Sequence, residues 1–330
     1  MVKQLKIQNY KSIRNLDLPC KKVNVFIGEP NSGKSNIIEA LGFLSQNIVN
    51  TETLKQVIRF KDIGGLFYDY NFTEPITINT GIIDAALKFD VRENGEIGNQ
   101  YLLTYNNTTE EGAKEQTITI THEGRIFTNI NFSTPFLLYE YKQLLTFQQH
   151  YLPHLSPPYG DNLPTVLLGN ADLRKWVADF FRSKGFKITL KPVQSEIEIS
   201  KEVDGSEYSY PYFVISETLQ RIVFYNIAIE SNKNKVLLFD EPDSNTFPFY
   251  TKYLGERIAL DDTNQFFITT HNPYLLLSLI EKTGTDNINV CVAQMKNYET
   301  VITVLDKEQV AQVLELNSDL FFNLDILTKA

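Results

Sequence analysis

Residues 28–35 read Gly-Glu-Pro-Asn-Ser-Gly-Lys-Ser and match the pattern G-x-x-x-x-G-K-[ST] without a gap. A compact, β-branched run at residues 23–27 precedes the motif, and apolar residues recur at helical spacing over residues 37–44. A strand, a glycine-rich loop and a helix in this order form the setting in which such a loop holds phosphate. The stretch therefore predicts a P-loop in an α/β fold.

The chemistry of phosphate binding explains the residue types in this loop. Glycine permits backbone dihedrals that turn successive N–H groups toward an anion, and the helix start adds the positive end of its dipole. Lys34 would reach the β- and γ-phosphates of ATP, and the Ser35 hydroxyl would be a ligand of Mg²⁺. A glycine-rich turn that fits the pattern by chance is the alternative, and the flanking elements argue against it. The residues expected to contact the nucleotide are Gly28, Asn31, Ser32, Gly33, Lys34, Ser35 and Asn36.

A pair of acids follows a second apolar run. Residues 236–239 read Val-Leu-Leu-Phe and lead directly into Asp240 and Glu241. A buried strand would deliver Asp240 beside the P-loop, where it would hold Mg²⁺ together with Ser35. Glu241 would polarise the attacking water as a catalytic residue. A strand that ends in a solvated acidic turn is the alternative, and the motif gains weight only in combination with the P-loop.

A histidine stands at the exit of a third apolar run. Residues 266–268 read Phe-Phe-Ile, and His271 follows after two threonines. A neutral imidazole at this place can contact the γ-phosphate. A lone histidine after a strand is more often structural, but its position after the acidic pair favours the functional interpretation. We therefore expect Glu241, His271 and Lys34 to form the catalytic set.

Bulk properties limit the classes of function. The chain has 330 residues and a formal net charge of -9, which argues against a protein that coats nucleic acid by charge alone. Two isolated cysteines, the lack of a signal-peptide pattern and the absence of a spanning apolar run predict a cytoplasmic protein without membrane contact. Nucleic-acid binding stays open because basic residues cluster between positions 174 and 191, although a solvated helix face is commoner. The cluster comprises Arg174, Lys175, Arg182, Lys184, Lys187 and Lys191.

The order of the elements suggests one domain with an insertion. Short alternating strands separated by turn formers predict an antiparallel β meander over residues 75–135. A helical part would follow over residues 136–230, including a helix at residues 137–149. The α/β pattern then returns. We expect lobe I to combine residues 1–70 and 231–330, and an inserted lobe II to span residues 71–230.

Several motifs together resemble the ABC-type ATPase heads of SMC, RecF and overcoming-lysogenization-defect (OLD) proteins. The similar stretches are residues 7–12, 24–28 and 31–36 at the start, then the D-E-P-D-S-N of residues 240–245 and the T-H-N-P of residues 270–273. The resemblance covers both ends of the chain well and the middle poorly. It implies a single ABC-type head with a mixed core sheet that uses ATP and Mg²⁺.

The family also implies a signature helix of pattern S-x-G-x-x-R before the acidic pair. Residues 216–221 read Ser-Glu-Thr-Leu-Gln-Arg, so Thr218 stands where the family has glycine. By resemblance, Ser216 would act in trans on ATP bound by a second copy, so that a homodimer sandwiches the nucleotide. Thr218 adds a side chain where backbones must come close, which puts closure and turnover in doubt. An ordinary N-capped helix is the alternative. The family's Q-loop glutamine has no candidate, because residues 60–69 contain none.

Two functions fit these motifs. The first is an ATPase, including one with slow turnover, that drives or gates a separate effector protein. The family resemblance suggests DNA repair or anti-phage defence as the process. The second is an ATP-bound scaffold or sensor with negligible turnover that regulates such an effector. About 60 residues follow His271, too few for the C-terminal Toprim nuclease domain of OLD proteins, so no nuclease activity is expected in this chain.

Overall fold

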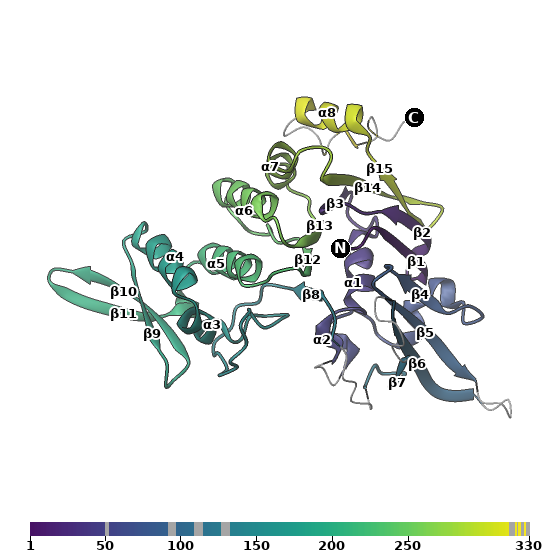
Figure 1. The fold of residues 1–330 in the computed structure, drawn as a ribbon, viewed down its shortest axis with the longest axis horizontal. Helices are drawn as coiled ribbons and strands as arrows, with labels where there is room; N and C mark the ends of the chain where they lie inside the picture. Colours follow the sequence, from purple (N-terminus) through teal and green to yellow (C-terminus); the bar gives the residue numbers. More distant parts are fainter. Residues whose placement is uncertain are drawn as a thin grey trace.

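The structure is a computed structural model, and it describes residues 1–49, 53–91, 97–108, 115–126, 133–316, 321, 323, 324 and 327. A mixed six-stranded core sheet lies at its centre in the order β15-β14-β3-β13-β12-β8 (Figure 1). Five of these strands run parallel, and β15 is antiparallel to β14. The mixed sheet expected from the sequence is confirmed. The strands are β3 (Val23–Gly28), β8 (Phe136–Tyr139), β12 (Val236–Asp240), β13 (Gln265–Thr269), β14 (Ile288–Lys296) and β15 (Glu299–Val304).

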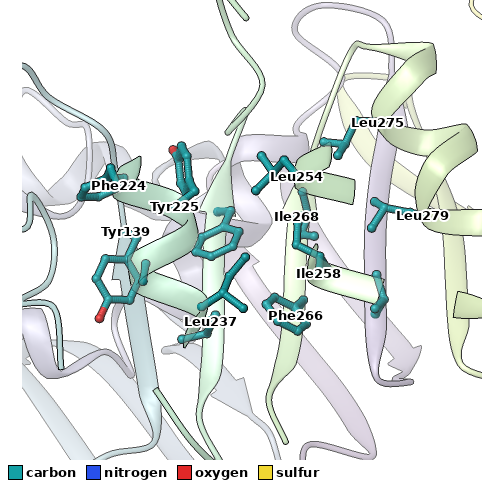
Figure 2. Packing of buried hydrophobic residues seen from close by; sticks show 14 of the residues in the cluster. Tyr139, Phe224, Tyr225, Leu237, Leu254, Ile258, Phe266, Ile268, Leu275 and Leu279 are labelled. Atoms are coloured by element: carbon teal, nitrogen blue, oxygen red, sulfur yellow. The ribbon is translucent and has the colours of Figure 1, made fainter. Parts of the chain in front are cut away.

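Helices cover both faces of this sheet, which explains why β3, β8, β12 and β13 are almost entirely buried. On one face, Leu237 and Phe266 of the strands pack against Leu254 of α6 and Leu275 of α7 (Figure 2). On the other face, Phe267 belongs to a second cluster together with residues of α1. Strands buried on both faces lose the alternating pattern of a half-exposed strand. The helices are α1 (Lys34–Gly42), α2 (Gln46–Val49), α5 (Glu217–Glu230), α6 (Pro248–Leu260), α7 (Pro273–Thr283) and α8 (Lys307–Leu316).

A second, antiparallel sheet contains the predicted meander. Its order is β2-β1-β4-β5-β6-β7, and β1 pairs with β4 through Ile7 and Ile78. The meander thus shares hydrogen bonds with the N-terminal hairpin, and the lobe boundary expected near residue 71 is no break in this sheet. Residues 127–130 of the last predicted strand lie outside the described residues. The strands are β1 (Gln4–Tyr10), β2 (Ile13–Pro19), β4 (Ile76–Asn79), β5 (Ile83–Val91), β6 (Ile97–Asn107) and β7 (Gln116–Thr121).

The helix predicted over residues 137–149 is wrong. Residues 136–139 form β8, an all-buried strand that pairs in parallel with β12, and residues 140–149 are irregular. A short apolar run without alternation suits a buried strand and a helix equally well, and the place beside β12 decides between them.

A smaller outer part follows β8 in the chain and projects from the core (Figure 1). Asn170 caps α4 by accepting hydrogen bonds from the backbone N–H groups of Asp172 and Leu173 at 3.0 and 3.1 Å. No described helix is long and apolar enough to cross a membrane. The outer elements are α3 (Leu163–Gly169), α4 (Ala171–Arg182), β9 (Lys187–Lys191), β10 (Glu196–Val203) and β11 (Ser206–Pro211). Single 3₁₀ turns occur at Leu54–Gln56, Ile63–Leu66, Tyr68–Tyr70 and Tyr212–Val214.

Candidate nucleotide-binding site

The glycines of the P-loop are required by their surroundings. Gly33 has a φ of 91°, and a Cβ atom at this position would lie 1.9 Å from Oγ1 of Thr300. Gly28 has a φ of 149°, and its Cβ would lie 2.2 Å from the carbonyl oxygen of Ala293. No L side chain fits either place without movement of the neighbouring strand. The loop is therefore held tightly between β3 and the C-terminal hairpin.

A chain of hydroxyl groups ties the P-loop to both ends of the sequence. Thr300 Oγ1 donates to the Ser32 carbonyl at 3.1 Å and lies 2.7 Å from Ser12 Oγ. Because Thr300 has a single hydroxyl proton, Ser12 donates to Thr300 in this arrangement. Ser12 Oγ then accepts the hydrogen bond from Asn36 Nδ2 at 2.8 Å. The loop geometry thus depends on residues 288 positions apart in the chain.

Ser35 and Asp240 lie side by side, as the predicted magnesium site requires. Ser35 Oγ donates to Asp240 Oδ1 at 3.1 Å. Thr269 Oγ1 donates to the same carboxylate oxygen and accepts from the Glu241 backbone N–H at 2.9 Å. Burial raises the pKa of Asp240. A hydroxyl and a carboxylate are hard oxygen donors of the kind that Mg²⁺ prefers, so these two side chains fit the ion.

Glu241 and His271 face each other at the same edge of the sheet. His271 Nε2 lies 3.2 Å from Glu241 Oε1, and Ser244 Oγ donates to Glu241 Oε2 at 3.2 Å. Burial and the positive charge of Lys34 lower the pKa of His271, so its imidazole is neutral at neutral pH. The predicted acid and histidine therefore lie in direct contact at the edge of the sheet.

Lys34 points into the loop that precedes it. Its Nζ donates to the carbonyl oxygens of Gly28 and Glu29 at 3.0 and 2.8 Å. Burial lowers the pKa of this ammonium, which the nearby charges of Glu241 and Asp240 counteract. A cation that is removed from water and surrounded by carbonyls is a strong site for an anion that can replace those weak acceptors.

These side chains converge on one cleft of about 400 Å³, a volume in the range of small-molecule sites. The structure brings together Asn31, Gly33, Lys34, Ser35, Asn36, Glu241 and His271 at its wall. Asp240 contacts Ser35 directly behind them, as described above. The remaining lining residues are Ser12, Pro30, Arg59 and Met295. A loop cradle with a lysine, a hydroxyl–carboxylate pair and a neutral histidine can hold and position a magnesium-bound triphosphate.

The predicted signature residue does not line this cleft. Ser216 is exposed at the start of α5, and its side chain makes no capping hydrogen bond. Thr218, in the place of the family glycine, donates its hydroxyl to the carbonyl of Asn245 at 3.1 Å. The helix predicted to carry the signature, α5, is thus linked to the loop that follows the acidic pair. The ordinary capping role that was the alternative for Ser216 is not observed.

Three residues of the site had no signal in the sequence. Thr300 supports the P-loop, and Arg59 lines the cleft with its NH2 atom 3.8 Å from Asp240 Oδ2. Glu140 follows β8 beside β12, where burial and the charge of Asp240 raise its pKa. Each owes its place to strand pairing or to an irregular loop, and none belongs to a short motif.

Three of the six cations in the basic cluster of the outer part form ion pairs with carboxylates. Arg182 pairs with Asp179 at 2.6 Å, and Lys187 pairs with Glu202 at 3.6 Å. Further partners are Glu198 for Lys191 and the carbonyls of Leu167 and Leu168 for Arg174. Paired cations attract phosphate weakly, so this half of the cluster does not by itself indicate a nucleic-acid interface.

Residues 23–278 match the family described as "AAA domain, putative AbiEii toxin, Type IV TA system". The chain belongs to this AAA family. The matched stretch begins with β3 and ends inside α7, so it contains the P-loop, the acidic pair and the histidine of the cleft. No curated protein matches the chain.

Solved heads of SMC proteins share the fold of this AAA family member. An SMC head bound to the C-winged helix domain of ScpA gives a TM-score of 0.54 at 14% identity, over 94% of this chain and 99% of that chain. A head with a coiled coil and joint from Pyrococcus yayanosii gives 0.51 at 10%, over 95% and 99%. A head with an extended coiled coil, bound to the C-terminal domain of ScpA and derived from Pyrococcus furiosus, gives 0.50 at 13%, over 95% and 98%. The expected ABC-type ATPase head is confirmed as a fold.

Proposed function

We propose that this protein binds ATP with Mg²⁺ in the cleft and hydrolyses it. The observation that supports this most strongly is the contact of 3.1 Å between Ser35 Oγ and Asp240 Oδ1, two groups that are 205 positions apart in the chain. Beside this contact, Glu241 and His271 line the same cleft as Lys34. Bound Mg²⁺ would neutralise phosphate charge as a Lewis acid.

The chain's own residues supply positioning and proton transfer. Backbone N–H groups at the start of α1 and the Lys34 ammonium bind the phosphates, with Gly28, Asn31, Ser32, Gly33 and Asn36 shaping the loop. Ser35 and Asp240 offer oxygen ligands to the metal. Glu241 orients the attacking water and accepts its proton, and the neutral imidazole of His271 donates a hydrogen bond toward the γ-phosphate.

Replacing the proposed base tests this function. The variant Glu241→Gln keeps the shape of the side chain but cannot accept a proton, so phosphate release should fall by about 100-fold or more. Binding of a fluorescent ATP analogue should remain. Glu256→Gln on α6, outside the cleft, is the matched control and should hydrolyse ATP like the wild type. Equal rates for the wild type and Glu241→Gln would remove Glu241 from the reaction.

We further propose that two copies close around two ATP molecules and act on a separate effector protein. Exposure of Ser216 at the helix start leaves its hydroxyl accessible to the nucleotide of a second copy. Two similar SMC head structures are bound to domains of ScpA, which supports a protein partner. DNA repair or anti-phage defence is the setting we propose, with nucleic-acid contact left to the assembled complex.

The hydrogen bond from Thr218 to Asn245 favours a second candidate, a nucleotide-bound scaffold or sensor with negligible turnover. Because this bond fixes the signature helix to the loop after the acidic pair, it resists the rearrangement that closure would need. Phosphate release per head over an hour separates the two functions. Nucleotide-dependent mass in solution, measured with Glu241→Gln, tests the dimer in either case.

A further inference from the structure

A buried carboxylate on the P-loop helix forms ion pairs with two cations at the edge of the cleft. Glu39 lies on α1, and its side chain is only 6% exposed. It accepts hydrogen bonds from Lys11 Nζ and, at 2.5 Å, from Arg59 Nε. Lys11 Nζ also donates to the Arg59 backbone carbonyl at 2.8 Å. Glu39 therefore holds the Arg59 side chain directly and the Arg59 backbone through Lys11.

The anchored guanidinium reaches the proposed magnesium ligand. Arg59 NH2 lies 3.8 Å from Asp240 Oδ2, while Oδ1 of the same carboxylate accepts from Ser35. The Arg59 side chain is 74% exposed, so its ion pairs, and not burial, hold it over the cleft. A planar guanidinium can engage one carboxylate through Nε and a second through NH2, which are separate nitrogens in a fixed geometry, whereas an ammonium has to reach both acceptors from a single nitrogen.

We propose that Arg59 competes with Mg²⁺ for Asp240, and that Glu39 is the positioning residue that holds Arg59 in this competition. The inference rests on the proposed function, because it assigns Mg²⁺ to Ser35 and Asp240. Both cations need the same carboxylate, and two positive charges on one carboxylate repel each other. The ion pair between Arg59 and Asp240 lowers the gain in nucleotide affinity that Mg²⁺ provides. Between rounds of binding, it balances the negative charge of the Asp240 carboxylate.

The test measures how much Mg²⁺ tightens the binding of one probe. A fluorescent, non-hydrolysable ATP analogue (mant-AMPPNP) is titrated in excess Mg²⁺ and in EDTA, and the ratio of the two Kd values is the Mg²⁺ gain. Because an exposed ion pair contributes about 0.2–1 kcal/mol, its loss should raise the gain roughly 1.4- to 5-fold. This increase is expected for Arg59→Gln and for Arg59→Lys, which keeps the charge but loses the fork.

For Glu39→Gln, two opposite changes in the Mg²⁺ gain can be distinguished. Removing a negative charge near the metal should by itself lower the Mg²⁺ gain, whereas release of Arg59 should raise it. We expect the gain to rise, and the double variant with Arg59→Gln to rise no further than Arg59→Gln alone. Arg182→Gln, an equally exposed arginine that pairs with Asp179 on α4, is the matched control and should leave the gain unchanged.

Three results would overturn the inference. An unchanged gain in Arg59→Lys reduces the role of Arg59 to its charge, and a lower gain in Glu39→Gln removes Glu39 as its anchor. Failure of the wild type to bind the analogue in Mg²⁺ would reject the proposed function itself and the inference with it. Thermal unfolding of each variant checks the fold, and the exposed Arg59 variants carry the test if Glu39→Gln does not fold.

Discussion

Thr300→Val tests whether the C-terminal hairpin fixes the shape of the P-loop. Valine has nearly the same shape as threonine, so the substitution removes a hydroxyl and leaves the packing in place. Thr300 is 6% exposed, and its hydroxyl joins the Ser32 carbonyl and the Ser12 hydroxyl at 3.1 and 2.7 Å. The variant therefore breaks a direct side-chain contact through which β15 holds the loop.

The structure sets the expected size of the effect. The residue Ser32 is 2% exposed, so its carbonyl loses a donor that water cannot easily replace, which costs about 1–3 kcal/mol. Ser12 is half-buried, and its hydroxyl can turn to solvent, so it adds little. We expect the free energy of unfolding to fall by about 1–3 kcal/mol. The affinity for the ATP analogue should fall as well, because the loop loses its support.

Urea denaturation and titration with the fluorescent analogue measure the two effects. Thr300→Ser keeps the hydroxyl and should preserve the affinity, with a loss of about 1 kcal/mol in stability from the missing methyl group. Thr303→Val on the same strand is the matched control for the change of residue type. The reasoning is refuted if Thr300→Val differs from the wild type by less than about 0.5 kcal/mol and binds the analogue equally well.

Two further predictions concern the loop after the acidic pair. Burial raises the pKa of Asp243 to about 6, so its stabilising protonated form is present at low pH and lost as the pH rises through that value. The amide introduced by Asp243→Asn cannot ionise, so this variant does not lose stability as the pH rises. Its free energy of unfolding relative to the wild type, measured by urea denaturation, should therefore rise by about 1 kcal/mol between pH 5 and pH 8. A difference that stays constant over this range would contradict the prediction. Thr218→Val removes the hydrogen bond to Asn245 and should lower the unfolding free energy by about 1 kcal/mol, whereas Thr218→Ser should retain it; equal losses in both variants would assign the effect to packing.

Contiguous patterns predicted the parts of the fold to which we assign the proposed chemistry. The P-loop, the acidic pair and the strand before His271 are each a short apolar run followed by polar residues, and parallel strands bring their carboxyl ends to one edge. Sequence alone therefore predicted that Ser35 and Asp240 would meet, and the contact of 3.1 Å bears out that proximity.

Residues that depend on long-range pairing could not be predicted in this way. β8 was mistaken for a helix because a buried strand of four apolar residues has no alternation to reveal it. Glu140 was missed with it, since its place beside Asp240 follows from the pairing of β8 with β12. Arg59 lies in an irregular stretch, where no periodicity predicts which side chains turn toward a cleft.

The order of the strands accounts for the one assignment that was weakest in the sequence. A lone histidine after an apolar run is ambiguous, but β13 lies between β3 and β12 in the core sheet. A residue at its carboxyl end must face the P-loop on one side and the acidic pair on the other. His271 does so, since it lines the same cleft as Lys34 and its Nε2 lies 3.2 Å from Glu241 Oε1. The central position of this strand therefore places His271 between the P-loop and the acidic pair.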